Sequence, residues 1–187
     1  MLLNSMMERE KVWKLVTAHL QTDYLLKHLI ATEACMKALA KKFGEDEVMW
    51  GTTGLIHDID LDDVKADPEQ HGKAGAQILR DEGYPDEIIN AVLAHADHKP
   101  PETRLEKAIC AVDPTTGFIV AATLVRQDKK ISGLEVKSIR KRMKEKRFAA
   151  NVDRKKILAA REMSIEVDDF LALCLEAMQR VSSDLGL

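Results

Sequence analysis

The sequence predicts an all-α fold, a single-domain helical bundle, on three observations. Ala, Leu, Lys and Glu are plentiful in the 187-residue chain while aromatic residues make up only 4%, and this mixture favours helices over sheets. Apolar residues recur with helical periodicity along most of the chain. No run shows the sustained alternation between hairpin turns that a strand needs. The length suits one sizeable core, so we expect residues 1–187 to form a single domain.

The expected elements begin with three helices, at residues 7–20, 23–44 and 45–57. Thr22 or Asp23 can cap the second of them, and Gly44 is a typical helix end. The acidic segment from residue 58 to residue 66 is short of helix signals, so we expect a loop there.

A further helix start is marked at Asp67. Asp67 can be the N-cap, Pro68 the first helical residue and Gln70 the third, which would close a capping box. We expect this helix to continue without interruption to Gly83, where glycine favours a helix end.

Proline and glycine punctuate the rest of the chain. A helix over residues 85–96 is stopped by the two prolines at 100 and 101. The stretch 102–125 is helical, with a break expected at Pro114, and Gly133 marks another break. Three shorter helices are expected at residues 136–143, 153–160 and 166–182.

Composition indicates a soluble cytoplasmic protein. The formal net charge of −3 offers no overall field to attract nucleic acid. Three scattered cysteines, Cys35, Cys110 and Cys174, are typical of reduced thiols. Residues 1–16 have no apolar signal-peptide region, and we find no stretch near the roughly 20 apolar residues of a membrane span.

Several residues of metal-ligand type lie on faces that should be buried. His28 shares a stripe with Leu25, Thr32 and Cys35, which should face the core. Burying an unpaired imidazole is costly, so His28 should either bond to a backbone carbonyl or bind a metal ion.

His57 and Asp58 stand at the end of the third expected helix. Adjacent helical residues point about 100° apart, so both can reach one ion only where the helix ends. The helix dipole alone would explain His57 but not Asp58. The small residues Gly51 and Gly54 would let a neighbouring helix bring in further ligands.

His71, His95 and Asp113 complete the set. His71 lies in the first turn of the Pro68 helix, where an exposed histidine is the alternative, and His95 points inward. Asp113 lies on an apolar stripe, although Asp followed by Pro is also a good N-cap. Each alternative explains one residue, but all would have to hold together. Imidazole with carboxylate suits one or two divalent Mn, Fe, Co, Ni or Zn ions.

The order of these residues resembles the HD-domain superfamily of metal-dependent phosphohydrolases. Residues 54–60 (GLIHDID) are similar to the signature around its His-Asp pair, and residues 71–79 (HGKAGAQIL) to the segment with the third histidine. The resemblance covers residues 25–126, and residues 137–153 are similar to a small bacterial HDIG-type subgroup. We therefore expect an HD-type metal-binding core at 22–126, with helical additions at 1–21 and 127–187.

The resemblance also implies roles. The first metal would be held by His28, His57, Asp58 and Asp113. His71 and His95 would complete a second metal site with Asp58 bridging, and Asp58 would act in catalysis by orienting the attacking water. The chain departs from the family pattern twice: Asp60 replaces the signature glycine, a change that leaves the ligands untouched, and Pro114 is expected to kink the helix that carries Asp113. His98 would be either a substitute ligand or a substrate-facing acid, and the other candidate substrate-facing residues are Lys73, Arg140 and Arg147.

The implied activity is hydrolysis of a phosphate ester by metal-activated water. The expected partner is a small phosphorylated molecule, a nucleotide or dinucleotide polyphosphate, and neither nucleic acid nor a membrane. Two alternatives stay open: an HD-type di-iron oxygenase that uses the same ligands, and a nucleotide-binding sensor module without turnover. The oligomeric state is not predicted.

A basic run at residues 137–147 contains seven Lys or Arg side chains and one Glu. Such runs are usually solvated helix faces. The alternative is that Lys137, Arg140 or Arg147 folds over the site and attracts an anionic substrate.

Overall fold

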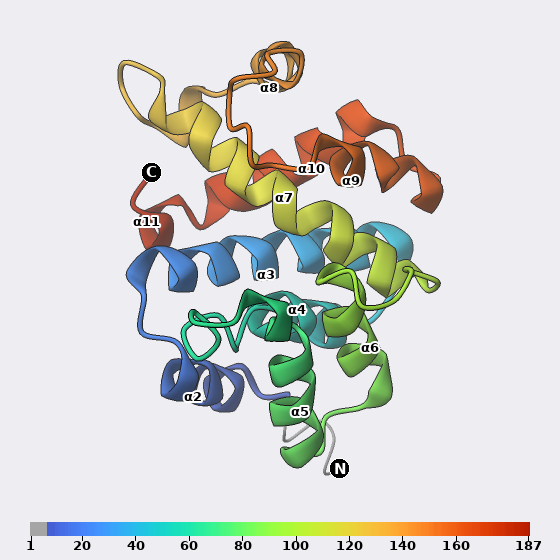
Figure 1. Cartoon of the computed structure of the whole chain (residues 1–187). Helices are drawn as coiled ribbons and strands as arrows, with labels where there is room; N and C mark the ends of the chain where they lie inside the picture. Colours follow the sequence, from blue (N-terminus) through green and yellow to red (C-terminus); the bar gives the residue numbers. More distant parts are fainter. Residues whose placement is uncertain (1–6) are drawn as a thin grey trace.

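Two long helices, α3 (Asp23–Phe43) and α7 (Arg104–Leu124), pack against each other at the centre of this computed structural model, which describes residues 7–187 (Figure 1). The described residues form helices, turns and loops and contain no strand, so the predicted all-α bundle is confirmed. The domain boundaries at residues 22 and 126 stay predictions, and residues 1–6 of the expected N-terminal addition lie outside the described part.

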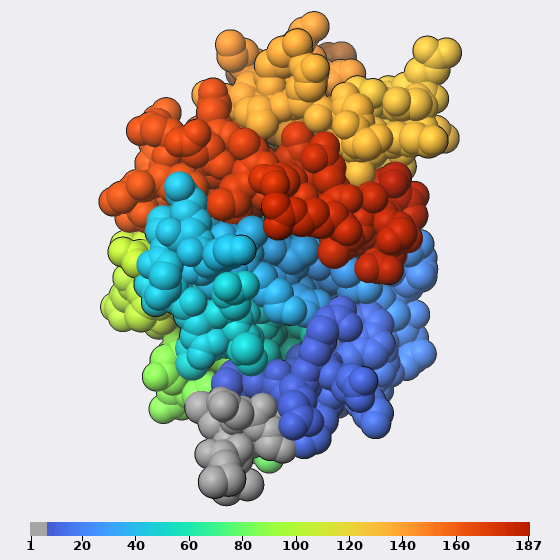
Figure 2. Space-filling view, turned by 180° about the vertical axis from the view of Figure 1, so that it is seen from behind, coloured from blue at the N-terminus to red at the C-terminus, as the bar shows by residue number. Residues whose placement is uncertain are grey.

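The other helices gather on two sides of this central pair. Below it in Figure 1 are α2 (Arg9–His19), α4 (Glu47–Ile56), α5 (Lys73–Asp81), α6 (Asp86–His95) and the short 3-10 helix η1 (Pro68–Gln70). Above α3 and around α7 are η2 (Ile131–Gly133), α8 (Val136–Met143), α9 (Arg154–Leu158), η3 (Ala159–Met163), α10 (Val167–Arg180) and α11 (Ser182–Leu185). Viewed from behind, the C-terminal residues lie directly against α3 (Figure 2).

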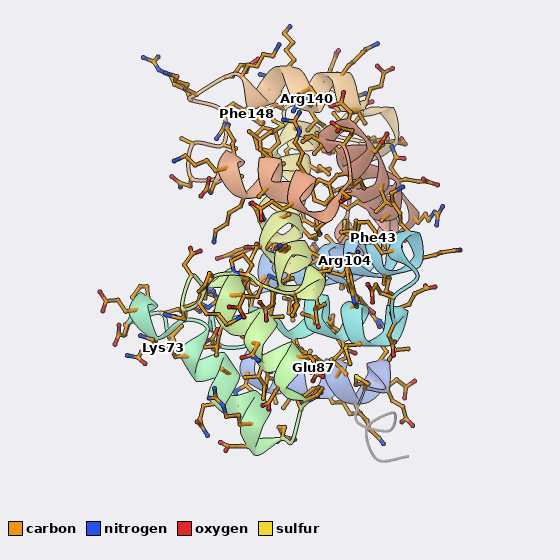
Figure 3. All side chains as sticks on the ribbon, turned by 90° about the vertical axis from the view of Figure 1, so that its right-hand side faces the viewer. Phe43, Lys73, Glu87, Arg104, Arg140 and Phe148 are labelled. Atoms are coloured by element: carbon orange, nitrogen blue, oxygen red, sulfur yellow. The ribbon has the colours of Figure 1, made fainter. Side chains whose placement is uncertain are left out.

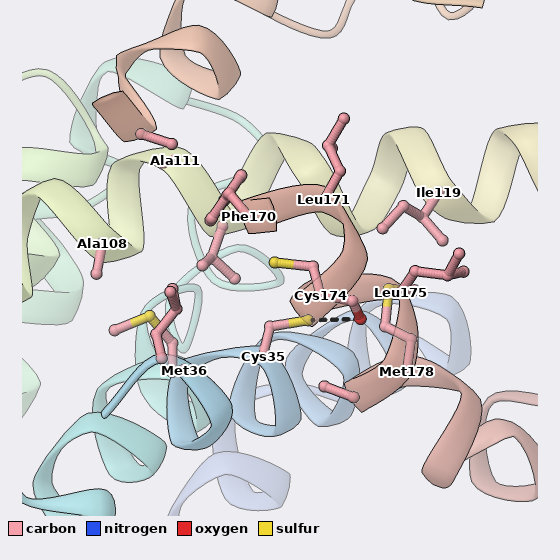
Figure 4. Close-up of a cluster of buried hydrophobic side chains, with 14 of the residues drawn as sticks. Cys35, Met36, Ala108, Ala111, Ile119, Phe170, Leu171, Cys174, Leu175 and Met178 are labelled. Atoms are coloured by element: carbon pink, nitrogen blue, oxygen red, sulfur yellow. Dashed lines mark hydrogen bonds between the residues drawn. The ribbon is translucent and has the colours of Figure 1, made fainter. Parts of the chain in front are cut away.

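Two clusters of buried apolar side chains hold these layers. The upper cluster joins α3 and α7 to the C-terminal helices and includes Met36, Ile119 and Phe170 (Figure 4). The lower cluster joins α2, α4, α5 and α6 and includes Leu29 and Ile88. Because α3 contributes residues to both clusters, it is fixed on two sides.

The cysteines are free and buried, as expected for reduced thiols. Cys35 and Cys174 meet inside the upper cluster, where the Cys35 thiol donates a hydrogen bond to the Cys174 carbonyl at 3.5 Å (Figure 4). Burial raises the pKa of the Cys174 thiol well above its usual value. Both thiols therefore behave as small apolar core groups.

The start of α3 is tied to the loop that follows α4. One carboxylate oxygen of Asp62 accepts hydrogen bonds from the backbone amides of Gln21 (2.7 Å) and Thr22 (3.0 Å), and the other accepts from the Thr22 hydroxyl (2.7 Å). At its far end α3 stops at Gly44, whose φ of 71° is the left-handed conformation that ends many helices. The segment after His57 is thereby anchored to the helix that carries His28.

Gly54 allows α4 to touch the backbone of α3, as the sequence predicted. A Cβ atom at Gly54 would lie 2.9 Å from the backbone of Thr32 and Glu33. At Gly51 a Cβ would meet only the flexible side chain of Lys37. The close approach at Gly54 brings the end of α4 beside His28.

Gly54→Ala is expected to lower the free energy of unfolding by about 1–3 kcal/mol, because backbone atoms cannot move aside as a side chain can. Gly51→Ala is the matched control and should change stability by less than about 1 kcal/mol, since Lys37 can shift and alanine favours a helix. Urea denaturation of both variants measures the difference. Equal stability of the two variants would contradict the close helix contact.

The predicted uninterrupted helix from Pro68 to Gly83 is wrong. Pro68 opens only a 3-10 turn, no capping box forms at Asp67, and α5 starts afresh at Lys73. The interruption is Gly72, whose φ of 80° no helix can contain. His71 therefore lies in a bend between two helices and not in a first helical turn.

The predicted break at Pro114 is also wrong, since α7 runs through it. Packing against α3, α6, α9 and α10 holds both halves of α7, which outweighs the roughly 3 kcal/mol cost of an internal proline. Thr103 and Glu106 form a complete capping box at its start. By length and composition α7 could cross a membrane, but 61% of its most apolar window is buried in the fold, as in the core helix of a soluble protein.

Candidate metal centre

Six side chains from five parts of the chain converge between the two layers. His28 comes from α3, His57 from the end of α4, Asp58 from the turn that follows and Asp113 from the middle of α7. The bend before α5 supplies His71, and the last residue of α6 is His95. Their ligand atoms form two groups, each able to hold one metal ion: His28, His57, Asp58 and Asp113, and Asp58, His71 and His95.

The first group surrounds a point between α3, α4 and α7. His28 Nε2 lies 3.2 Å from His57 Nε2, 3.2 Å from Asp113 Oδ1 and 3.5 Å from Asp58 Oδ2. His57 Nε2 lies 3.3 Å from Asp58 Oδ2 and 3.9 Å from Asp113 Oδ1. His57 is fully buried, whereas 30% of the Asp113 side chain is exposed. The group is therefore open to solvent on the α7 side.

The second group lies on the other side of Asp58. His71 Nε2 and His95 Nε2 are 3.2 Å apart. Asp58 Oδ1 lies 3.4 Å from His71 Nε2 and 3.2 Å from His95 Nε2. Asp58 thus turns one oxygen to each group, which makes it the shared member of both.

Each of the four histidines has its other ring nitrogen engaged. His57 Nδ1 lies 2.9 Å from the Gly54 carbonyl, and His95 Nδ1 bonds to the Val92 carbonyl. His28 Nδ1 lies 3.0 Å from the Thr116 hydroxyl, which itself donates to the Asp113 carbonyl. Carbonyl oxygens only accept, so these Nδ1 atoms carry the proton and Nε2 keeps a free lone pair. Such partners orient metal-binding histidines.

The donor set fits divalent metal ions. Ligand atoms about 2.0–2.2 Å from one ion are about 2.8–3.6 Å apart at octahedral or tetrahedral angles, and most of these pairs fall in that range. Free lone pairs facing each other at such distances repel unless a cation lies between them. Without such a cation a proton takes its place on His57 Nε2: burial opposes a charge on His57, yet the nearby carboxylates of Asp58 and Asp113 raise its pKa to about 9. The arrangement of the six side chains is therefore stabilised by a positive charge between them.

Asp60 has a role that sequence reasoning missed. It is fully buried, and its Oδ1 lies 2.8 Å from His71 Nδ1. Its Oδ2 accepts hydrogen bonds from the amides of Gly72 and Gly75, both at 2.8 Å. Burial would raise the pKa of Asp60, but the hydrogen bond with His71 and the two amides hold it below its usual value. Asp60 therefore orients His71, and it accepts hydrogen bonds from backbone amides at the start of α5, as an N-cap side chain would.

The candidate substrate-facing residues lie in different places. His98 Nε2 bonds to the His71 carbonyl at 2.6 Å, so it braces the bend that carries His71. Lys73 is exposed at the start of α5. Arg140 pairs with Asp168 at 2.9 Å on α8, at the opposite end of the molecule from Lys73 (Figure 3). Arg147 is exposed in the segment after α8. The structure does not bring the basic run of residues 137–147 over the cluster, which supports the interpretation as a solvated face.

Comparison with known proteins agrees with this geometry. Residues 25–117 match the HD domain family. Ribonuclease Y of a Nitratiruptor species is 34% identical over 88 residues, 47% of this chain and 17% of that protein. Ribonuclease Y of a Sulfurovum species is 26% identical over 132 residues, 69% of this chain and 26% of that protein. The similarity therefore spans only a minor part of these relatives. No solved structure matches this chain significantly.

Proposed function

This chain belongs to the HD domain family through residues 25–117, and on that premise we propose that it hydrolyses a small phosphate ester with one or two divalent metal ions. The observation that carries the proposal is the shared carboxylate of Asp58, with one oxygen toward each group of ligands. Two adjacent metal sites suit phosphate ester hydrolysis, because one ion can stabilise the attacking oxygen and the other the leaving oxygen.

The position of each residue in the cluster suggests its role. His28, His57, Asp58 and Asp113 would hold one ion, and Asp58, His71 and His95 would hold the other. When bound, such ions supply Lewis acidity and lower the pKa of water. Asp58 would orient the attacking water, since it lies at the centre of the cluster with only 9% of its side chain exposed. Thr116 and Asp60 would keep His28 and His71 in place.

Nucleotides and dinucleotide polyphosphates are one substrate class within this proposal, and the expected cytoplasmic location is compatible with them. RNA is a second candidate, favoured by the name ribonuclease Y of two relatives. RNA binding depends on Lys and Arg side chains along the strand. Arg140 of the basic run, however, lies at the opposite end of the molecule from Lys73, which follows His71 by two residues (Figure 3). We therefore place the small phosphate ester first.

Metal analysis combined with a substrate panel tests the proposal. The protein is purified without chelator, and its Mn, Fe, Co, Ni and Zn contents are measured. Hydrolysis is followed as phosphate release from phosphate monoesters and as nucleotide release from diadenosine tetraphosphate and a short RNA. We expect chelation to stop phosphate release and re-addition of one metal to restore it. Metal-loaded protein that hydrolyses none of these substrates, but takes up oxygen when it holds iron, would contradict the proposal and favour an oxygenase.

A further inference from the structure

A pocket of about 390 Å³ opens directly beside the first group of ligands. His28 and Asp58 form its inner end, while its walls come from three separate parts of the chain: α3, the second half of α7 and the C-terminal residues. The apolar wall side chains are Leu25, Ala31, Val120, Leu185 and Leu187, and Tyr24, Lys27 and Thr116 also line the pocket. Its size is near the lower end of the range of about 300–1,000 Å³ for small-molecule sites.

The pocket offers apolar surface and few free polar groups. The hydroxyl of Thr116 is already engaged by His28 and by the Asp113 carbonyl. Lys27 lies at the rim and pairs with Asp23 at 2.8 Å. Tyr24 also carries a hydroxyl, but this residue is 71% exposed. The polar edge of a nucleobase would therefore find few partners inside the pocket, and a buried polar group without partners is costly. An apolar group suits the walls better.

Gly117 widens this pocket at a cost to helix stability. It lies inside α7, where glycine is less stable than alanine. Its φ is not positive, and a Cβ atom there would have no atom within 4 Å. Neither the backbone conformation nor packing therefore requires glycine. A side chain at position 117 would instead occupy part of the pocket.

We propose that the pocket receives the organic part of the phosphate ester, and that this part is a compact apolar group such as an aryl or branched alkyl group. The inference rests on the proposed hydrolysis, because the phosphate would lie at the His28 and Asp58 end. Lys27 is the one Lys or Arg side chain among the described residues of the lining. The pocket thus selects an ester with one phosphate over a strand with many.

Binding of non-hydrolysable phosphonates tests this selection without relying on turnover. Metal-loaded protein is titrated with 1-naphthylphosphonate and with methylphosphonate, and wild type is compared with Gly117→Leu and Gly117→Ala. We expect wild type to bind the naphthyl compound at least tenfold more tightly than the methyl compound. Gly117→Leu should lose that difference while keeping its metal content. Gly117→Ala should lose part of it and raise the melting temperature by about 2–4 °C.

Val120→Phe fills the same pocket from one turn along α7 and controls for a local effect of the leucine at position 117. It should also remove the preference for the naphthyl compound. No preference in wild type, or a preference that survives both bulky variants, overturns the proposal. Turnover separates it from the proposed function: if wild type prefers the naphthyl compound but releases phosphate from no ester, the pocket stands and hydrolysis fails.

Discussion

Asp58→Ala is expected to reduce phosphate release by a factor of about 10³ or more while the fold stays intact. The substitution removes one ligand atom from each of the two groups at once, because Asp58 is the member they share. It also removes the carboxylate that lies within 3.5 Å of all four imidazole Nε2 atoms, and only those of His28 and His57 keep another carboxylate nearby, that of Asp113. Metal content measured on the purified variant should fall together with activity.

Asp63→Ala is the matched control. Asp63 lies in the same loop, half exposed, and pairs with His19 at 2.8 Å and with no member of the cluster. Its loss should leave metal content and phosphate release within a factor of about two, as for an ordinary surface substitution. Circular dichroism of both variants checks the fold. Full activity in Asp58→Ala would exclude the mechanism proposed here.

The sequence predicts most helices well because their ends carry local signals. Gly44 ends α3 in the left-handed conformation, and α8 spans the residues expected. The errors occur where tertiary contacts override those signals. Gly72 interrupts a helix that capping rules favour, and the packing of α7 carries it through Pro114. Neither outcome can be read from the residues around the break.

Prediction of the site follows the same division. Four histidines and two aspartates on otherwise apolar faces are conspicuous because burying such groups alone is costly, and the structure brings all six together. Thr116 and Gly117 gave no such signal, since a threonine and a glycine in a helix are unremarkable until the position of His28 and the pocket is known. Arg140 was a candidate because of its charge alone, and charge does not determine how far a side chain lies from the ligand cluster.

Asp60 shows this limit most clearly, and its substitution gives the second large expected effect. From the sequence it is a change from the signature glycine that leaves the ligands untouched. In the structure its two oxygens accept from three donors that lie 11, 12 and 15 residues later in the chain. No local pattern predicts such contacts.

Asp60→Asn is expected to weaken metal binding at the second group by about 10–100-fold, as loss of a partner that orients a metal-binding histidine does. An asparagine has one acceptor oxygen and one NH₂ donor. If the oxygen faces His71, the NH₂ group meets the amides of Gly72 and Gly75, and if it is turned round, the NH₂ group meets His71 Nδ1. Either orientation leaves a buried donor unpaired, so the free energy of unfolding should also fall by about 1–3 kcal/mol.

The first group contains no contact with Asp60, so its ion should be retained. Calorimetric metal titration of wild type, Asp60→Asn and the loop control Asp63→Asn resolves the two affinities. Selective weakening of one of the two binding events in Asp60→Asn means that Asp60 acts through His71, because a merely unfolded loop would also displace Asp58 and reduce both affinities. Two unchanged affinities would show that His71 needs no such support.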